Sequence, residues 1–532
     1  MSANNTSKGL QGWTSSPDGR GTLDIFWACL VTVFLSTWSA ICLNVPEPND
    51  TTWTRIRRKM WITIISLLGP ECLLGYALGE WQSARASVAE FKQLRQDDEW
   101  TLKHAFFAIM GGFVLRTSDD VRFFLDEKQI LWLLQRQAIS TAQFEKSFLL
   151  DSKTISDRNN SDTFIRLIAV GQALWFCINI IARASQGLAV TTLEITVIGI
   201  IVDSILVYYF WKDKSADVES IEVISINITL GELILLEEDE AARTRPYFRT
   251  PLDFVSRSIW YFNLIYQYLI NTLKSLRPHA WQRSKKKSLG RRSDNDVLPV
   301  TGVTMVIGVF FGLTFMGINF IAWNFHFPTP IERLLWRLSS CGLVVIACLG
   351  MPVAELLYTK RGIKRMQEKV QKRRKALEGF NLPDKAKWKD RLVYRFRTGV
   401  MKIRNNSPGN DPSLDVSLLF VLGIVFFFGT YFLFRAYILV EDFIAFRAMP
   451  ADGGALLNWN TTVEADVEES LGEEVKKLRE RLREADPVKE GAHDNSEVTR
   501  RVVTGHMATR LKLVSQVLSP ISPMPLRAMT AE

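Results

Sequence analysis

The sequence predicts an all-α integral membrane protein, a bundle of about seven transmembrane helices with long, partly helical soluble loops. Its long apolar runs each approach the roughly 20 residues that a helix needs to cross a hydrocarbon core of about 30 Å. In lipid, only a helix satisfies all its backbone groups within one segment. Charged residues make up 23% of the chain and lie mostly between the runs. The runs are residues 23–43, 61–78, 164–182, 188–211, 297–323, 335–358 and 414–439.

The chain divides into a polar segment at 1–22, a bundle at 23–450 and a polar tail at 451–532. The first segment contains no apolar h-region, so we expect no cleavable signal peptide, and the first span then acts as its own insertion signal. All six cysteines fall inside the apolar runs, which predicts small buried hydrophobes rather than a disulfide-bonded ectodomain. Tryptophans at several run ends are typical of an aromatic belt at the headgroups.

The second run contains Gly69-Pro70-Glu71. Proline removes a backbone donor, so we expect a helix kink at this point. The kink frees a carbonyl beside Glu71, which lies near the middle of the membrane in this prediction. A freed carbonyl together with a carboxylate has the chemistry of a cation or proton site.

Large loops are expected at 79–163, 212–296 and 359–412. Residues 104–115 are apolar but too short to span, which indicates an interfacial, re-entrant or buried segment. Residues 120–150 have the periodicity of an amphipathic helix, whereas residues 224–230 alternate apolar and polar side chains, as a short strand does.

The third large loop begins with a dense run of basic residues that we expect to continue the sixth span as a helix. On the cytosolic side this helix would bind anionic lipid headgroups; alternatively it only fixes the membrane orientation. Nucleic acid is not an expected partner for a basic surface held against a membrane. The candidate lipid-binding residues are Lys360, Arg361, Lys364, Arg365, Lys372, Arg373, Arg374 and Lys375.

In the tail, residues 466–486 carry a heptad spacing of apolar side chains, which predicts a short amphipathic helix. Two heptads are few for a coiled coil, and we expect the rest of the tail to be disordered. A homo-oligomer is compatible with these features.

Basic residues favour the cytosolic side of a membrane. The loops after spans 2, 4 and 6 carry about 11, 14 and 17 lysines and arginines, against about 4, 1 and 1 in the loops after spans 1, 3 and 5. The even loops are therefore expected in the cytosol, with the N-terminus inside and the tail outside. The basic residues at 55–59 contradict this assignment, and a re-entrant segment would change the side of the termini.

Ionisable residues within apolar runs are the candidates for function, because each costs roughly 2.5–3.5 kcal/mol to insert at a helix centre. Acids outnumber bases among them, and an interior with surplus carboxylates attracts cations or protons. Alternatively, the acids hold helices together or pair with Arg435, and Asp24 and Arg435 reach the membrane surface. The candidate ion or proton path comprises Asp24, Glu71, Glu194, Asp203, Glu355 and Arg435, with Glu441 and Asp442 near the end of the last run.

Enzyme motifs are almost absent. Five histidines form no HExxH and no histidine clusters, and we found no phosphate-binding loop and no GxSxG. We therefore predict no catalytic residues, no bound metal and no cofactor, and a membrane-embedded enzyme that uses scattered acids is the least favoured class. A channel or transporter-like bundle for cations or protons is preferred. The alternative is a receptor-like or scaffold protein that docks through its basic loops and tail.

Eight short motifs are distinctive when taken together: Gly12-Trp13, Gly21-Thr22-Leu23-Asp24-Ile25, Gly69-Pro70-Glu71, Ile181-Ala182-Arg183-Ala184, Thr191-Thr192-Leu193-Glu194, Ile321-Ala322-Trp323, Glu332-Arg333-Leu334-Leu335-Trp336 and Val440-Glu441-Asp442-Phe443. With these motifs, residues 12–450 resemble a large group of fungal multi-pass membrane proteins with about seven spans and no established activity. The resemblance implies a fungal origin and a shared bundle. From the apolar runs, we expect the protein in the plasma membrane or another secretory-pathway membrane.

Overall fold

A computed structural model describes residues 10–11, 21–46, 50–150, 163–216, 218, 220–244, 250–256, 298–357 and 418–450, with short pieces between 368 and 396. By internal contacts the chain divides into two compact units, Met1–Leu457 and Asn458–Glu532, and all described residues belong to the first. The predicted tail helix at 466–486 and most of the third large loop lie outside the described residues.

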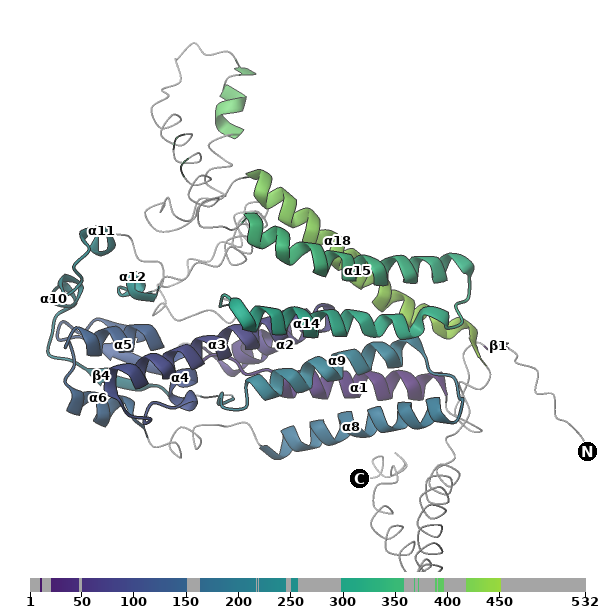
Figure 1. The fold of residues 1–532 in the computed structure, drawn as a ribbon, viewed down its shortest axis with the longest axis horizontal. Coiled ribbons are helices and arrows are strands. Elements are labelled where there is room, and N and C mark those ends of the chain that lie inside the picture. The colour runs from purple at the N-terminus through teal and green to yellow at the C-terminus, as the bar shows by residue number, and fades with distance from the viewer. Residues whose placement is uncertain are drawn as a thin grey trace, which may run out of the picture. The chain divides into compact units, whose positions relative to one another are not determined.

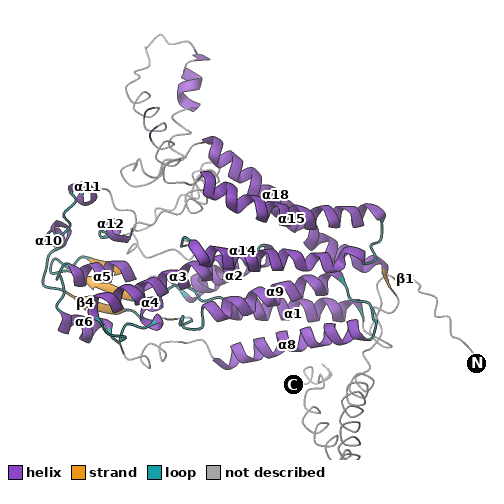
Figure 2. Ribbon diagram, viewed as in Figure 1, coloured by secondary structure: helices purple, strands orange, loops and turns teal. Residues whose placement is uncertain are grey.

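Long helices form most of the described chain, and in Figures 1 and 2 those of the bundle lie side by side. Helix α1 packs on α8 and α9, α9 packs on α3 and α14, and α15 packs on α14 and α18. The bundle helices are α1 (Thr22–Ala40), α2 (Thr52–Leu68), α3 (Pro70–Arg95), α8 (Thr163–Ser185), α9 (Thr192–Phe210), α14 (Gly302–Ile318) with the 3-10 turn η2 (Asn319–Asn324), α15 (Pro330–Leu357) and α18 (Leu418–Ile444).

Four described segments are long and apolar enough to cross a membrane: Thr22–Ala40, Arg166–Ser185, Thr192–Phe210 and Gly302–Asn324. A fifth results if the bent pair α2–α3 counts as one span. The helical bundle with apolar spans is therefore confirmed. A total of seven spans stays a prediction.

The predicted second span at 61–78 is not one kinked helix. Helix α2 ends at Leu68, and α3 begins at Pro70 with its axis turned by 115°. Gly69 lies between them in a conformation that is not helical. Proline has no N–H to continue α2 but fits the first position of a new helix, where no intrahelical donor is needed. The expected kink is consequently a complete break.

At one end of the bundle, the loops 79–163 and 212–296 contribute to a small α/β subdomain, so the expectation of an all-α fold was wrong in this region. Strand β2 (Phe113–Arg116) pairs antiparallel with β3 (Arg122–Leu125) and parallel with β4 (Glu222–Ser225), giving the order β3-β2-β4. The strand predicted over 224–230 is confirmed only at Ile224 and Ser225, because β4 ends at Ser225 and a helix begins at Leu230. A two-residue pairing of β1 (Leu10–Gln11) with β5 (Met449–Pro450) lies at the other end of the bundle (Figure 1).

The apolar segment 104–115 is buried in this subdomain. It forms α4 (Leu102–Ile109) and most of β2, and the side chains from Ala105 to Met110 are at most 1% exposed. Residues 120–150 are not one helix, as predicted, but β3 followed by two short helices. Asp126 and Ser140 each accept a hydrogen bond from a backbone N–H of the following helix, which starts a new helix at each. These short helices are α5 (Glu127–Gln135) and α6 (Thr141–Phe148).

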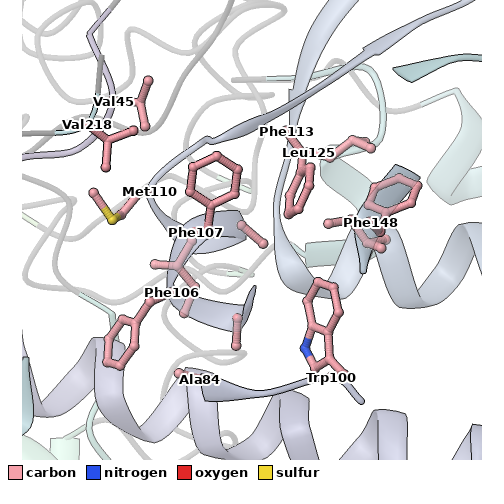
Figure 3. Packing of buried hydrophobic residues seen from close by; sticks show 14 of the residues in the cluster. Val45, Ala84, Trp100, Phe106, Phe107, Met110, Phe113, Leu125, Phe148 and Val218 are labelled. Atoms are coloured by element: carbon pink, nitrogen blue, oxygen red, sulfur yellow. The ribbon is translucent and has the colours of Figure 1, made fainter. Parts of the chain in front are cut away.

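Aromatic side chains dominate the core of the subdomain. Figure 3 shows Trp100 near Phe113 and Phe148, with Phe106 and Phe107 on the neighbouring turns. The Trp100 ring stacks on Phe91 of α3 at 4.4 Å between centroids, and its indole nitrogen donates to the Ser87 hydroxyl at 3.1 Å. Because Phe91 and Ser87 both belong to α3, this helix connects the bundle to the subdomain core.

Further short helices, α10 (Leu230–Leu235), α11 (Glu240–Arg243) and α12 (Asp253–Ser256), follow β4, and η5 (Ala445–Ala448) follows α18. All six cysteines are free, and two of them, Cys29 and Cys42, are buried.

Candidate functional site

Three of the six predicted path residues come together inside the bundle. Glu71 lies in the first turn of α3, Asp203 in α9 and Arg435 in α18. Arg435 is 1% exposed and Asp203 is 2% exposed. The charges of the three groups interact with one another. We call Glu71, Asp203, Arg435 and the neighbouring Tyr431 the interior cluster.

Glu71 is held by the helix break and by α18. The Tyr431 hydroxyl donates a hydrogen bond to Glu71 Oε1. The other carboxylate oxygen, Oε2, is enclosed and has no hydrogen-bond partner among the residues described. A side chain at Gly69 would begin 3.2 Å from the Tyr431 hydroxyl oxygen, so glycine at the break allows α18 to approach closely.

Arg435 is buried without a direct ionic partner in the described part of the chain. Its guanidinium lies 4.8 Å from the centroid of the Phe315 ring of α14, a cation–π contact. None of its three nitrogens makes a hydrogen bond to a described residue, and no ion pair joins it to Glu71 or Asp203. The alternative that Arg435 reaches the membrane surface was therefore wrong.

Enclosed polar atoms continue from the interior cluster toward the end of α18. Both carboxylate oxygens of Asp203 are buried and lack hydrogen-bond partners among the described side chains and backbone, and Asp442 is 1% exposed. Asp442 lies beside the hydroxyls of Thr192 and Thr196 on α9. An unsatisfied buried polar group costs about 1–3 kcal/mol, and proteins normally satisfy such groups with internal water. The arrangement therefore has the chemistry of a hydrated polar site.

Two of the other predicted residues are helix caps. The Glu194 carboxylate accepts from the Thr191 backbone N–H at 2.8 Å, while the Thr191 hydroxyl accepts from the Glu194 N–H at 3.3 Å. Asp24 accepts from the Gly21 N–H at 2.9 Å and is exposed. The capping spacing Thr-x-x-Glu at 191–194 is visible in the sequence and identifies Glu194 as a helix-start residue.

The remaining predicted residues are only partly described. The backbone at Glu355 belongs to α15, but its side chain is outside the described set. Of the eight candidate lipid-binding residues in the third large loop, only Lys372 is described, and it is exposed.

Sequence reasoning missed a buried ion pair between Glu80 of α3 and Lys214, which follows α9. Its two side chains are fully enclosed, and Lys214 Nζ also lies 4.4 Å from the centroid of the Trp211 ring. No simple sequence signal relates two residues so far apart. The aromatic neighbours Tyr76 and Trp211 only indicate that both segments are buried.

Residues 1–237 match a family of unknown function, DUF8562. This stretch contains Glu71 and Asp203 and ends before Arg435. No curated protein and no solved structure matches the chain.

Proposed function

We propose that this protein is an integral membrane bundle that passes protons or small cations along its interior carboxylates, with Glu71 and Asp203 at the centre of the path. The observation that carries the proposal is the convergence of Glu71, Asp203 and Arg435 from three separate helices into one enclosed cluster. Ionisable side chains at such depth commonly belong to ion or proton paths.

In this proposal, α2 and α3 form a re-entrant hairpin rather than a span. Lys59 of α2 lies over the ring of Trp38, at 5.2 Å and near the end of α1. At the tip, Gly69 and Glu71 contact Tyr431, near the middle of α18. A bend of 115° then directs α3 back toward the subdomain. There Gln82 bonds to Thr301, just before α14, with Nε2 to Oγ1 at 2.7 Å.

The chain then crosses the membrane six times, through α1, α8, α9, α14 with η2, α15 and α18. The basic residues at 55–59 come to the same side as the three large loops, which removes their conflict with the positive-inside rule. This side is the cytosol, and both ends of the bundle segment, residues 21 and 450, face the opposite compartment. This proposal differs from the sequence-based expectation, which put the N-terminus in the cytosol.

The break between α2 and α3, at Gly69, puts non-helical backbone next to Glu71 inside the bundle. Non-helical backbone at membrane depth is tolerated where it is buried in protein or lines a water-filled cavity. Glu71 and Asp203 carry two negative charges when ionised, and Arg435 compensates one of them. The uncompensated charge is balanced by a proton or a cation, and Tyr431 can relay a proton to or from Glu71 through its hydroxyl.

A purely structural role predicts a different arrangement for Arg435. Polar groups that hold helices together form direct hydrogen bonds across the interface, as Tyr431 does with Glu71. The guanidinium of Arg435 instead contacts a ring and forms no ion pair with a described carboxylate. The geometry of Arg435 favours a path over inter-helix fixation.

The test is proton and potassium flux through the purified protein in liposomes, compared with Glu71→Gln and Asp203→Asn. We expect each variant to reduce flux about tenfold or more, because a positioned proton-transfer group contributes at least that factor. Asp24→Asn is the matched control, since this carboxylate caps a helix end and should leave flux unchanged. If wild type and variants are equally silent while all stay folded, the proposal is wrong.

A further inference from the structure

We propose that the first half of α2 is a binding surface for anionic phospholipid headgroups. Between Thr51 and Trp61 the sequence contains four basic residues and no acid. They are Arg55, Arg57, Arg58 and Lys59. This inference concerns a different surface from the interior cluster and does not depend on flux.

The apolar side chains of α2 are turned outward and its small polar ones inward. Trp53 is 70% exposed, Trp61 is 52% exposed, and Ile56, Met60 and Ile64 are each at least 40% exposed. These residues recur at helical spacing along one side. In contrast, Thr63 and Ser66 are each 2% exposed and donate to carbonyls of their own helix. A helix with this reversed distribution has its apolar side in contact with lipid.

The basic residues lie at the membrane surface. Lys59 is next to Trp38 near the end of α1, at the end of the bundle that carries the subdomain. A few residues after α1, the Val45 N–H donates to the Met110 carbonyl of the subdomain at 3.1 Å. Tryptophans flanking a basic segment are typical of helices at headgroup depth.

Arg58 forms an ion pair with Asp50, with 3.2 Å between Nη1 and Oδ2. Arg57 is exposed and makes no hydrogen bond or ion pair to the residues that the structure describes. The surface therefore presents the positive charge of Arg57 next to exposed tryptophan and aliphatic side chains. This combination matches a lipid with a negative headgroup above acyl chains, and each basic residue strengthens such binding about fivefold.

The test is native mass spectrometry of the full-length protein, purified in detergent and titrated with phosphatidylserine or phosphatidylcholine. We expect the wild type to retain phosphatidylserine preferentially. Arg57→Gln should weaken that retention about fivefold, whereas Arg57→Lys should preserve it. Because Arg57 is exposed, its replacement should not affect folding, and size-exclusion chromatography checks this.

Arg333→Gln is the matched control, since Arg333 is also exposed but lies in the first turn of α15. It should leave phosphatidylserine retention unchanged. Equal retention of the two lipids by the wild type would overturn the proposal. So would an equal loss in Arg57→Gln and Arg333→Gln, because that result would indicate attraction to the total charge of the protein rather than to a surface on α2.

Discussion

Lys214 and Glu80 form an ion pair with 2.7 Å between Nζ and Oε2, and neither side chain is accessible to solvent. The pair joins the outgoing part of α3 to the chain just after α9. Taking two charges out of water is expensive, so such a pair is stable only when both partners are present. The pair therefore connects α3 to the chain after α9 at a point where either charge alone would be strongly unfavourable.

We predict that Lys214→Met destabilises the protein by about 3–5 kcal/mol, because it leaves the Glu80 charge buried and uncompensated. The double variant Glu80→Leu/Lys214→Met should regain most of this loss. Thermal unfolding in detergent, followed by tryptophan fluorescence, measures both effects. Lys92→Met is the control, since Lys92 pairs with Asp98 on the surface and its loss should cost less than about 1 kcal/mol. Single and double variants of equal stability would contradict the coupling.

The re-entrant hairpin predicts which residues share a side of the membrane. In sealed vesicles, a membrane-impermeant maleimide should label Arg57→Cys and Arg116→Cys from the same side. It should label Ala184→Cys, in the last turn of α8, only from the other side. If α2 and α3 instead formed one span, Arg57→Cys and Ala184→Cys would react together. The protein without added cysteines supplies the background.

Asp126 in the subdomain should make the folded state more stable at low pH than at neutral pH. Burial, reinforced by the neighbouring Glu127 carboxylate, raises the pKa of Asp126 to about 6, although its Oδ1 accepts the Gln129 N–H at 2.9 Å. The folded state therefore binds a proton more tightly than the unfolded state, where the pKa of aspartate is about 3.9. The resulting stability is fully present below about pH 4 and is lost as the pH rises through about 6.

Asp126→Asn should remove this pH dependence while keeping the helix cap, because asparagine caps as well as aspartate. The difference in unfolding free energy between wild type and variant should change by about 2–3 kcal/mol from pH 4 to pH 7. Comparing the two proteins cancels other titrations, including that of His104, whose pKa burial lowers. A difference that does not vary with pH would refute the assignment.

Close packing of α15 on α18 depends on Gly342. A Cβ atom at this position would collide with the Phe434 ring. We expect Gly342→Ala to destabilise the protein by about 1–3 kcal/mol through overpacking, and Gly342→Ala/Phe434→Leu to recover part of that loss. Gly171→Ala in α8 is the matched control, because a Cβ atom there has no neighbour within 4 Å. Unfolding temperatures of equal value for both alanine variants would exclude the close contact.

The sequence alone predicted the helices of the bundle, because hydrocarbon thickness and backbone hydrogen bonding leave little choice for a long apolar run. It also identified Glu71, Asp203 and Arg435, since a charge in an apolar run stands out by composition. The alternating pattern at 224–230 indicated a strand in this region but not its bounds, since β4 covers Glu222–Ser225. These features are local, and each can be recognised within about 20 residues.

Only the tertiary structure decided which of these residues lie close together. Glu194 and Asp24 satisfy backbone donors at helix starts, whereas Glu71 and Asp203 meet Arg435 through the packing of α3, α9 and α18. The direction of α3 after Gly69 was not predictable either, because proline fixes where a helix begins but not the angle at which it packs. That angle depends on contacts with distant helices, which include the Tyr431 hydroxyl at the hairpin tip and the Lys214 ammonium near the subdomain.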